Sequence, residues 1–197
     1  EREGNLIAQA RTPHMSRLLA VEPSALLEAA GEAVGMPAGT VGNSEVGHLH
    51  LGAGRRIYSD RLRIDRSIRD GSFFENPAFV QAMEGAIREG KRLHLLGIVS
   101  FYSSHGSVAH LKGLMQMAQA RGVPEVYVHG MLGRRGERPE SGAIYVEEIE
   151  REAARLNAGR MVSVIGRYWS LDREENWDRI EKTYRWLVEG AGRRVFA

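Results

Sequence analysis

LHLLGIV, residues 93–99, is the stretch that decides the fold class of this chain. It is an almost continuous apolar run with the length of one β-strand, and it lies between two stretches with helical periodicity. Before it, residues 78–89 predict a helix that ends at Gly90. An apolar strand between helices is typical of a parallel sheet. We therefore expect residues 93–99 to form a strand that is buried on both faces.

The same alternation repeats toward the C-terminus. Further strands are predicted at residues 126–129 and 161–165. The predicted helices are an apolar face from Val108 to Ala118, residues 143–156, and residues 177–188. Alternating strands and helices imply a parallel sheet with right-handed crossovers. The fold class predicted for this part is α/β, a parallel sheet flanked by helices.

The N-terminal part has a different character. A short helix is predicted at Pro13–Leu19 and a short buried strand at Ala25–Glu28. Residues 58–69 are polar and rich in arginine, and they predict a helix or linker that leads into the second unit. We therefore divide the chain into residues 1–58 and residues 59–197.

A glycine-rich loop ends the first unit. Residues 41–48 read VGNSEVGH, and six glycines fall between positions 35 and 54. Ser44 sits in a turn where the backbone can bend sharply and approach an anion, just before a segment that can begin a helix. The alternative interpretation is that Asn43 or Ser44 simply caps that helix.

Composition restricts the classes of function. The chain has 197 residues, of which 43% are hydrophobic and 26% charged, and it has no cysteine. Disulfides and thiol chemistry are thereby excluded, and a reducing compartment fits. A net charge of +2 does not favour nucleic acid, and no apolar run has membrane-spanning length. Because the chain begins at Glu1 rather than at methionine, we expect it to be a fragment.

Three segments follow the predicted strands, at residues 100–107, 131–141 and 166–173. Ligands of parallel sheets bind beyond the carboxyl ends of the strands. Histidine and arginine side chains in these segments suit a ligand with phosphate and carboxylate groups. The basic residues in these segments are His105, Arg134, Arg135, Arg167 and Arg173.

Residues 42–54 resemble the serine motif of a known family. That motif reads G-N-S-E-V-G-H-L-N-I-G-A-G, and only positions 50 and 51 differ here. On this motif the chain resembles the cofactor-independent (2,3-bisphosphoglycerate-independent) phosphoglycerate mutases of the alkaline phosphatase superfamily. Further similar stretches are residues 10–13, 27–35 and 166–168, Asp172-Arg173, and Trp177.

The resemblance implies a fold and an activity. Residues 59–197 would be an incomplete phosphotransferase-type, substrate-binding domain, and residues 1–58 a piece of an alkaline-phosphatase-like α/β domain. The family interconverts 3- and 2-phosphoglycerate in glycolysis through a phosphoserine. It uses two manganese ions, and its members are expected to be cytoplasmic and to have no nucleic-acid or membrane partner.

The resemblance also assigns site residues. Ser44 matches the serine that takes the phosphoryl group and helps to hold one manganese ion. The residues that match the substrate-binding positions are His105, Arg135, Arg167 and Arg173. The other metal ligands of the family lie outside this chain, so the chain alone is expected to be inactive and not to bind manganese. A structural or exposed role is expected for His48 and His50 rather than metal ligation. The full-length protein is expected to be a monomer.

Three departures keep other functions open. Phe101, Gly133 and Gly136 stand where the family has aspartate. Loss of an aspartate removes an acceptor for a substrate hydroxyl, which matters for discrimination between substrates. One alternative is a non-catalytic or truncated relative that binds anions. Another is a different phosphate-ester enzyme of the same superfamily.

Overall fold

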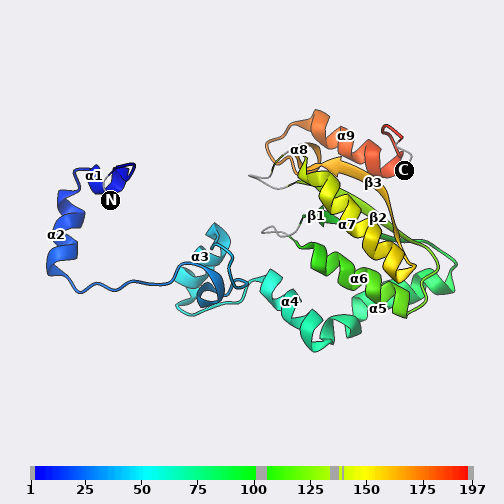
Figure 1. Cartoon of the computed structure of the whole chain (residues 1–197), viewed down its shortest axis with the longest axis horizontal. Helices are drawn as coiled ribbons and strands as arrows, with labels where there is room; N and C mark the ends of the chain where they lie inside the picture. The colour runs from blue at the N-terminus through cyan, green and yellow to red at the C-terminus, as the bar shows by residue number, and fades with distance from the viewer. Residues whose placement is uncertain (1–2, 101–105, 134–137, 139, 195–197) are drawn as a thin grey trace.

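The computed structural model describes residues 3–100, 106–133, 138 and 140–194, and Figure 1 shows their arrangement. The predicted ligand residues His105 and Arg135 lie outside the described residues, as do Phe101 and Gly136. The elements, with η for short 3₁₀ helices, are α1 (Leu6–Gln9), α2 (Pro13–Val21), η1 (Gly31–Val34), α3 (Ser44–Ala53), α4 (Asp60–Asp70), η2 (Ser72–Glu75), α5 (Pro77–Arg88), β1 (Leu93–Val99), α6 (Val108–Ala120), β2 (Val126–Leu132), α7 (Ser141–Leu156), β3 (Arg160–Gly166), α8 (Arg167–Ser170) and α9 (Trp177–Val188).

The three strands form one parallel sheet in the order β1-β2-β3. Leu93 pairs with Val126 and Val99 with Leu132, and Leu132 pairs in turn with Gly166. The predicted α/β class is confirmed, and β1 has the predicted bounds. Because neighbouring parallel strands end level with one another, the segments that follow them begin at one edge of the sheet.

One face of the sheet carries the main hydrophobic core. The helices α6 and α7 connect neighbouring strands in sequence, so right-handed crossovers place both on this face. Met115 of α6 and Ile149 of α7 are completely buried there, against Val128 of β2. Met83 of α5 belongs to the same cluster. Burial of each large apolar side chain contributes about 1.5–3 kcal/mol, so this face stabilises the sheet unit.

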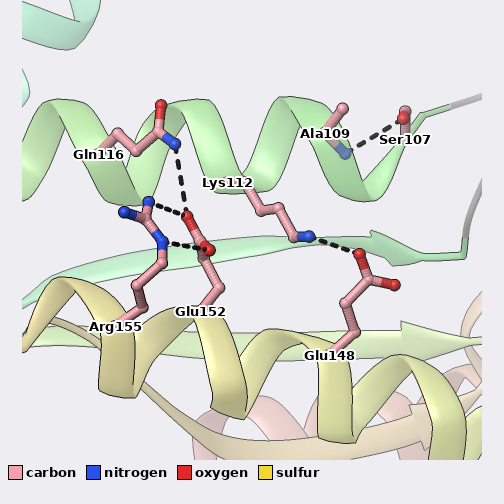
Figure 2. Close-up of polar contacts among 7 residues, drawn as sticks. All are labelled: Ser107, Ala109, Lys112, Gln116, Glu148, Glu152 and Arg155. Carbon is pink, nitrogen blue, oxygen red and sulfur yellow. Dashed lines mark hydrogen bonds and ion pairs between the residues drawn. The ribbon is translucent and has the colours of Figure 1, made fainter.

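A row of polar contacts joins α6 to α7 beside this core (Figure 2). The Glu152 carboxylate accepts hydrogen bonds of 2.9 and 2.7 Å from the Arg155 guanidinium and one of 3.4 Å from Gln116. The bonds from Arg155 hold the pKa of Glu152 below its ordinary value. Glu148 pairs with Lys112 along the same seam. The bonds from Gln116 and Lys112 join α6 to α7, whereas those from Arg155 lie within α7 and orient the Glu152 carboxylate.

The second face of the sheet is more open than the sequence predicts. Helix α9 reaches it through Trp186, whose ring stands edge-on to that of His129 with the ring centroids 6.1 Å apart. Leu96 of β1, which pairs with His129, keeps 50% of its surface exposed. The prediction that residues 93–99 are buried on both faces is therefore wrong for the described chain. The reason is that, among the described residues, α6 and α7 cover the first face, whereas α9 reaches the second face through Trp186 and leaves Leu96 half exposed.

Three polar side chains line up on this second face. Nδ1 of His94 lies 2.9 Å from Nε2 of His129, and Nδ1 of His129 lies 2.7 Å from the Ser163 hydroxyl. Burial, and then the neighbouring His94, lower the pKa of His129 below its ordinary value. His129 is thus held neutral at a pH where a solvated histidine already binds a proton.

We expect the free energy of unfolding to fall when the pH is lowered from about 6.5 through the native pKa of His129. In that range the unfolded chain binds more protons than the folded one. The stabilisation from neutral His129 is therefore complete above this pH range and is lost below it. A His129→Gln variant should flatten this pH dependence, whereas His14→Gln, on the exposed α2, should not. Urea unfolding followed by tryptophan fluorescence over this pH range measures it. If the free energy of unfolding of His129→Gln depends on pH as steeply as that of the wild type, the expectation is contradicted.

The N-terminal residues stand apart from the sheet unit (Figure 1). The helix predicted at Pro13–Leu19 is confirmed as α2. The strand predicted at Ala25–Glu28 is wrong, because these residues form no strand and Leu26 and Leu27 are exposed. A strand needs a partner for its backbone hydrogen bonds, and the described chain supplies none beside this segment.

The predicted helix or linker at residues 58–69 is the helix α4. Ser59 caps it, with its hydroxyl accepting a hydrogen bond of 3.3 Å from the N–H of Leu62. Toward the sheet unit, Asp65 lies 2.7 Å from Nε2 of His110 in α6. Helix α4 therefore attaches to the sheet unit through a partly buried polar contact.

Candidate active site

Ser44 is the first residue of α3, and its side chain is exposed. The residue before it, Asn43, is the N-cap: its Oδ1 accepts a hydrogen bond of 2.9 Å from the N–H of Val46. Of the two predicted caps, Asn43 is the correct one. The Ser44 hydroxyl is not used for capping, and it stands in the first helical turn, where the positive end of the helix dipole attracts anions. An open pocket here is lined by Ser44, Glu45, His48, Leu49, Gly52, Ala53 and Ile57.

Two glycines hold the serine loop together. A Cβ on Gly35 would lie 2.0 Å from the carbonyl oxygen of Ile57, and one on Gly42 would lie 2.6 Å from that of Ala29. The sequence predicts that glycines on both sides of Ser44 let the backbone bend and approach an anion. In the structure, Gly35 and Gly42 let one backbone segment approach another. Asn43, the N-cap of α3, directly follows Gly42.

The two histidines of α3 differ in their contacts. Nε2 of His50 accepts a hydrogen bond of 3.0 Å from the N–H of Ile57, and its Nδ1 contacts the Val46 carbonyl oxygen. The structural role predicted for His50 is confirmed. His48 is exposed, and its Nδ1 lies 2.7 Å from the carbonyl oxygen of Ser44 and 3.2 Å from Ser44 Oγ.

The residues around Ser44 do not make a metal site by themselves. In the part of the chain that the structure describes, no group of three or more His, Asp or Glu side chains is placed to hold a metal ion. A neutral hydroxyl is a weak metal ligand, whereas a divalent ion such as Mn²⁺ takes several carboxylates and imidazoles. The described residues therefore do not fit a two-metal centre, which would need ligands from elsewhere.

The second group of predicted residues follows the sheet. Val99, Leu132 and Gly166 lie side by side in the three strands, so the segments after them start at a common edge. This confirms the shared edge predicted for the three segments. Arg167 and Arg173 lie in the third segment.

Arg167 begins α8, where the sequence predicts a loop. The N–H of Leu171 donates a hydrogen bond of 2.9 Å to the carbonyl of Arg167, which closes a helical turn. A Cβ on Gly133 would lie 3.8 Å from Cγ of Arg167, so the arginine stem runs beside the segment that follows β2. Among the described residues, neither Arg167 nor Arg173 has a carboxylate partner. Both guanidinium groups are thus available to an anion.

Asp172, between these arginines, has a role that the sequence did not predict. Its carboxylate is 3% exposed and accepts a hydrogen bond of 2.8 Å from Arg179 of α9. It also accepts bonds from the N–H groups of Glu174 and Asn176. Burial alone raises the pKa of Asp172, but these bonds outweigh it and hold the pKa below its ordinary value. These hydrogen bonds fix the conformation of the loop that carries Arg173.

Ser44 and the two arginines do not lie close together in the structure. Ser44 lies in α3, which packs against η1, whereas the arginines lie beyond β3. Figure 1 shows α3 and α8 well apart. The predicted site residues that the structure describes thus lie in two separate places, Ser44 at the start of α3 and the two arginines beyond β3.

Comparison with known proteins gives consistent matches. Residues 64–196 match the family model described as BPG-independent PGAM N-terminus. The chain is 46% identical over 195 residues to the 2,3-bisphosphoglycerate-independent phosphoglycerate mutase of Moorella thermoacetica. It is 44% identical over 190 residues to the protein of the same name from Lachnoclostridium phytofermentans.

These matches cover nearly all of this chain but only part of the relatives. The two alignments take in 99% and 96% of the chain, and 38% and 37% of the relatives. Among solved structures, a Leishmania mexicana phosphoglycerate mutase determined at low cobalt concentration matches with a TM-score of 0.80 and 27% identity. That match covers 95% of this chain and 36% of the other. The chain therefore spans less than two fifths of the length of these proteins.

Proposed function

This chain belongs to the 2,3-bisphosphoglycerate-independent phosphoglycerate mutase family, and we propose that it is part of an enzyme that interconverts 3- and 2-phosphoglycerate in glycolysis. In this proposal Ser44 accepts the phosphoryl group, and the basic edge of the sheet holds the glycerate. The observation that carries the proposal is the position of Ser44, exposed at the start of α3 with Asn43 taking over the capping.

The proposed reaction has two transfers. Ser44 Oγ attacks phosphorus, the bond from phosphorus to the substrate oxygen breaks, the serine gives up its proton, and the freed substrate oxygen takes one up. The glycerate then turns, and its other hydroxyl attacks the phosphoserine in the same way. The first turn of α3 supports this role because its amide N–H groups and helix dipole favour the added negative charge.

Holding the glycerate while it turns is the proposed task of the sheet edge. Guanidinium groups donate paired hydrogen bonds to carboxylate or phosphate oxygens. Arg167 and Arg173 are available for such bonds, since neither is paired among the described residues. His105 and Arg135, from the two neighbouring segments, are proposed as further contacts.

Other features belong to the full-length protein. We propose that it uses manganese, held by Ser44 and by ligands outside this chain, and that it acts as a monomer in the cytoplasm. The boundary between its two units is proposed to lie between residues 58 and 59, which agrees with the attachment of α4 to α6. The described part of the chain contains no helix with the length and apolarity to span a membrane.

A direct assay tests the proposal. Full-length protein incubated with 3-phosphoglycerate and Mn²⁺ should form 2-phosphoglycerate, and a chelator should abolish the conversion. The present chain alone should show no turnover, because the described residues contain no group of three or more side chains that could hold a metal ion, and the proposal takes the ligands other than Ser44 from outside this chain. Failure of the metal-loaded full-length protein to convert either isomer would contradict the proposal.

A second candidate function is favoured by Gly133. Its φ of 93° lies in a region that side-chain-bearing residues rarely adopt, so aspartate would be strained at this point. The sheet edge then lacks one acceptor for a substrate hydroxyl and should be less selective. The candidate is an enzyme of the same superfamily that acts on another phosphorylated acid. Other phosphate monoesters, offered in the same assay, distinguish the two.

A further inference from the structure

We propose that His48 is a positioning residue for Ser44: its Nδ1–H donates a hydrogen bond to Ser44 Oγ and fixes the orientation of the hydroxyl. This inference deepens the proposed function and rests on it, because the orientation matters only if Ser44 takes up a phosphoryl group. The two residues lie four apart on α3, a spacing that places side chains on the same side of a helix.

The contacts of Nδ1 decide where the imidazole proton lies. The nitrogen is 2.7 Å from the carbonyl oxygen of Ser44. A carbonyl oxygen only accepts hydrogen bonds, so Nδ1 must carry the proton. The same N–H lies 3.2 Å from Ser44 Oγ, which is therefore a second acceptor. The hydroxyl proton of Ser44 then points away from His48.

This arrangement excludes one role and supports another. A protonated Nδ1 cannot take the proton of Ser44, so His48 does not act as the base of a Ser–His pair through the nitrogen that touches the serine. A donor aimed at Oγ instead stabilises the negative charge that develops as the hydroxyl loses its proton. It also restricts the χ1 rotation of Ser44, which keeps the oxygen available to an incoming phosphorus.

His50 supplies an internal comparison on the same helix. Its Nδ1 faces the Val46 carbonyl with the same spacing, and its Nε2 accepts a hydrogen bond from the N–H of Ile57. Both of its nitrogens are used in the fold. In the described part of the chain, no residue hydrogen-bonds to Nε2 of His48, and what Nδ1 contacts beyond the backbone is the hydroxyl of Ser44.

Amide variants separate the two nitrogens of His48 in the full-length protein. The side-chain N–H of asparagine occupies the place of Nδ1–H, whereas that of glutamine reaches the place of Nε2. We expect His48→Ala to lower kcat by about 10²-fold, as loss of one donor to a developing oxyanion does. His48→Asn should recover most of that loss and His48→Gln should not. KM should stay near the wild-type value in all three variants, and the control His14→Gln should match the wild type.

A general base or a metal ligand would behave differently. If His48 acted as the base, asparagine would be as damaging as alanine, and the acid limb of the pH–rate profile would disappear. If it bound metal through Nε2, the Mn²⁺ dependence would shift and glutamine would be the better replacement. A surface role without positioning would leave kcat unchanged in His48→Ala. Each of these three results overturns the proposal.

A measurement on the present chain separates this inference from the proposed function. The ¹⁵N shifts of the His48 ring distinguish a protonated nitrogen from an unprotonated one, and they need no activity. We expect the Nδ1–H tautomer at neutral pH. Finding the proton on Nε2 overturns the positioning role. An inactive wild-type protein with the Nδ1–H tautomer contradicts the mutase proposal alone.

Discussion

Replacing Ser44 with alanine in the full-length protein is expected to reduce mutase turnover by on the order of 10⁴-fold or more. The nucleophile is the one group whose loss removes the covalent route altogether. The proposed binding of the substrate at the sheet edge should survive, because Arg167 and Arg173 lie in a separate part of the molecule. The effect should therefore appear in kcat, with little change in the affinity for phosphoglycerate. A coupled assay for 2-phosphoglycerate measures the first, and calorimetric titration the second.

The structure predicts that this loss has no component from unfolding. Asn43, not Ser44, caps α3, and Ser44 is exposed. Asn43→Ala should destabilise the start of the helix by about 1 kcal/mol, whereas Ser44→Ala should not. Ser24→Ala, which removes an exposed hydroxyl from the same unit, is the matched control for turnover. Mass spectrometry should find a phosphoryl group on Ser44 in the wild type. A Ser44→Ala protein with residual activity near that of Ser24→Ala would refute the covalent route.

The elements of the sheet unit could be predicted because their signals are local. The run at residues 93–99 and the stripe at residues 177–188 each appear with the predicted bounds, since apolar periodicity and terminal glycines act within one element. The short helix α8 escaped prediction because four residues carry too little periodicity. The exposure of Leu96 escaped it for another reason: an apolar run shows that a strand has a buried face, and not how many faces the described chain covers.

The sequence could indicate which residues belong to the candidate site, but not how the folded chain arranges them. The sequence motifs indicated Ser44 and the arginines. The loop that carries Arg173, however, is held in place by Asp172, and this depends on the ion pair of Asp172 with Arg179, seven residues later. A lone aspartate gives no sign of such a partner. The packing role of the glycines could not be predicted for a similar reason. Gly35 faces Ile57, a residue far along the chain, and only the folded structure shows that a backbone oxygen fills the place of its side chain.

Substitution of Gly35 by alanine is expected to destabilise the serine loop by more than about 3 kcal/mol. Two costs add at this residue. Its φ of 67° lies in the left-handed region, and a Cβ would lie 2.0 Å from the carbonyl oxygen of Ile57. Neither backbone segment can move away freely, because the N–H of Ser59 donates a hydrogen bond of 2.8 Å to the Gly35 carbonyl.

The same loop contains a control for each cost. Gly39 has a φ of 71° with open space around it, so Gly39→Ala should show only the backbone cost, about 1 kcal/mol. Gly42 lies outside the left-handed region, and its Cβ would approach the Ala29 carbonyl at 2.6 Å, so Gly42→Ala should show only the clash. Gly35→Ala should exceed both.

Hydrogen exchange is the suitable measurement, because all three tryptophans lie in the sheet unit and do not report on this loop. The amides of Ser59 and Ile57, which bond to the Gly35 carbonyl and to Nε2 of His50, should lose protection in Gly35→Ala while those of the sheet keep it. The amide of Val46, bonded to Asn43, should follow, because a loop that cannot close no longer fixes the start of α3. Ser44 would then lose its place in the first helical turn. Unchanged protection of these amides would show that the loop yields to a Cβ at Gly35, and that the close approach does not hold the serine turn in place.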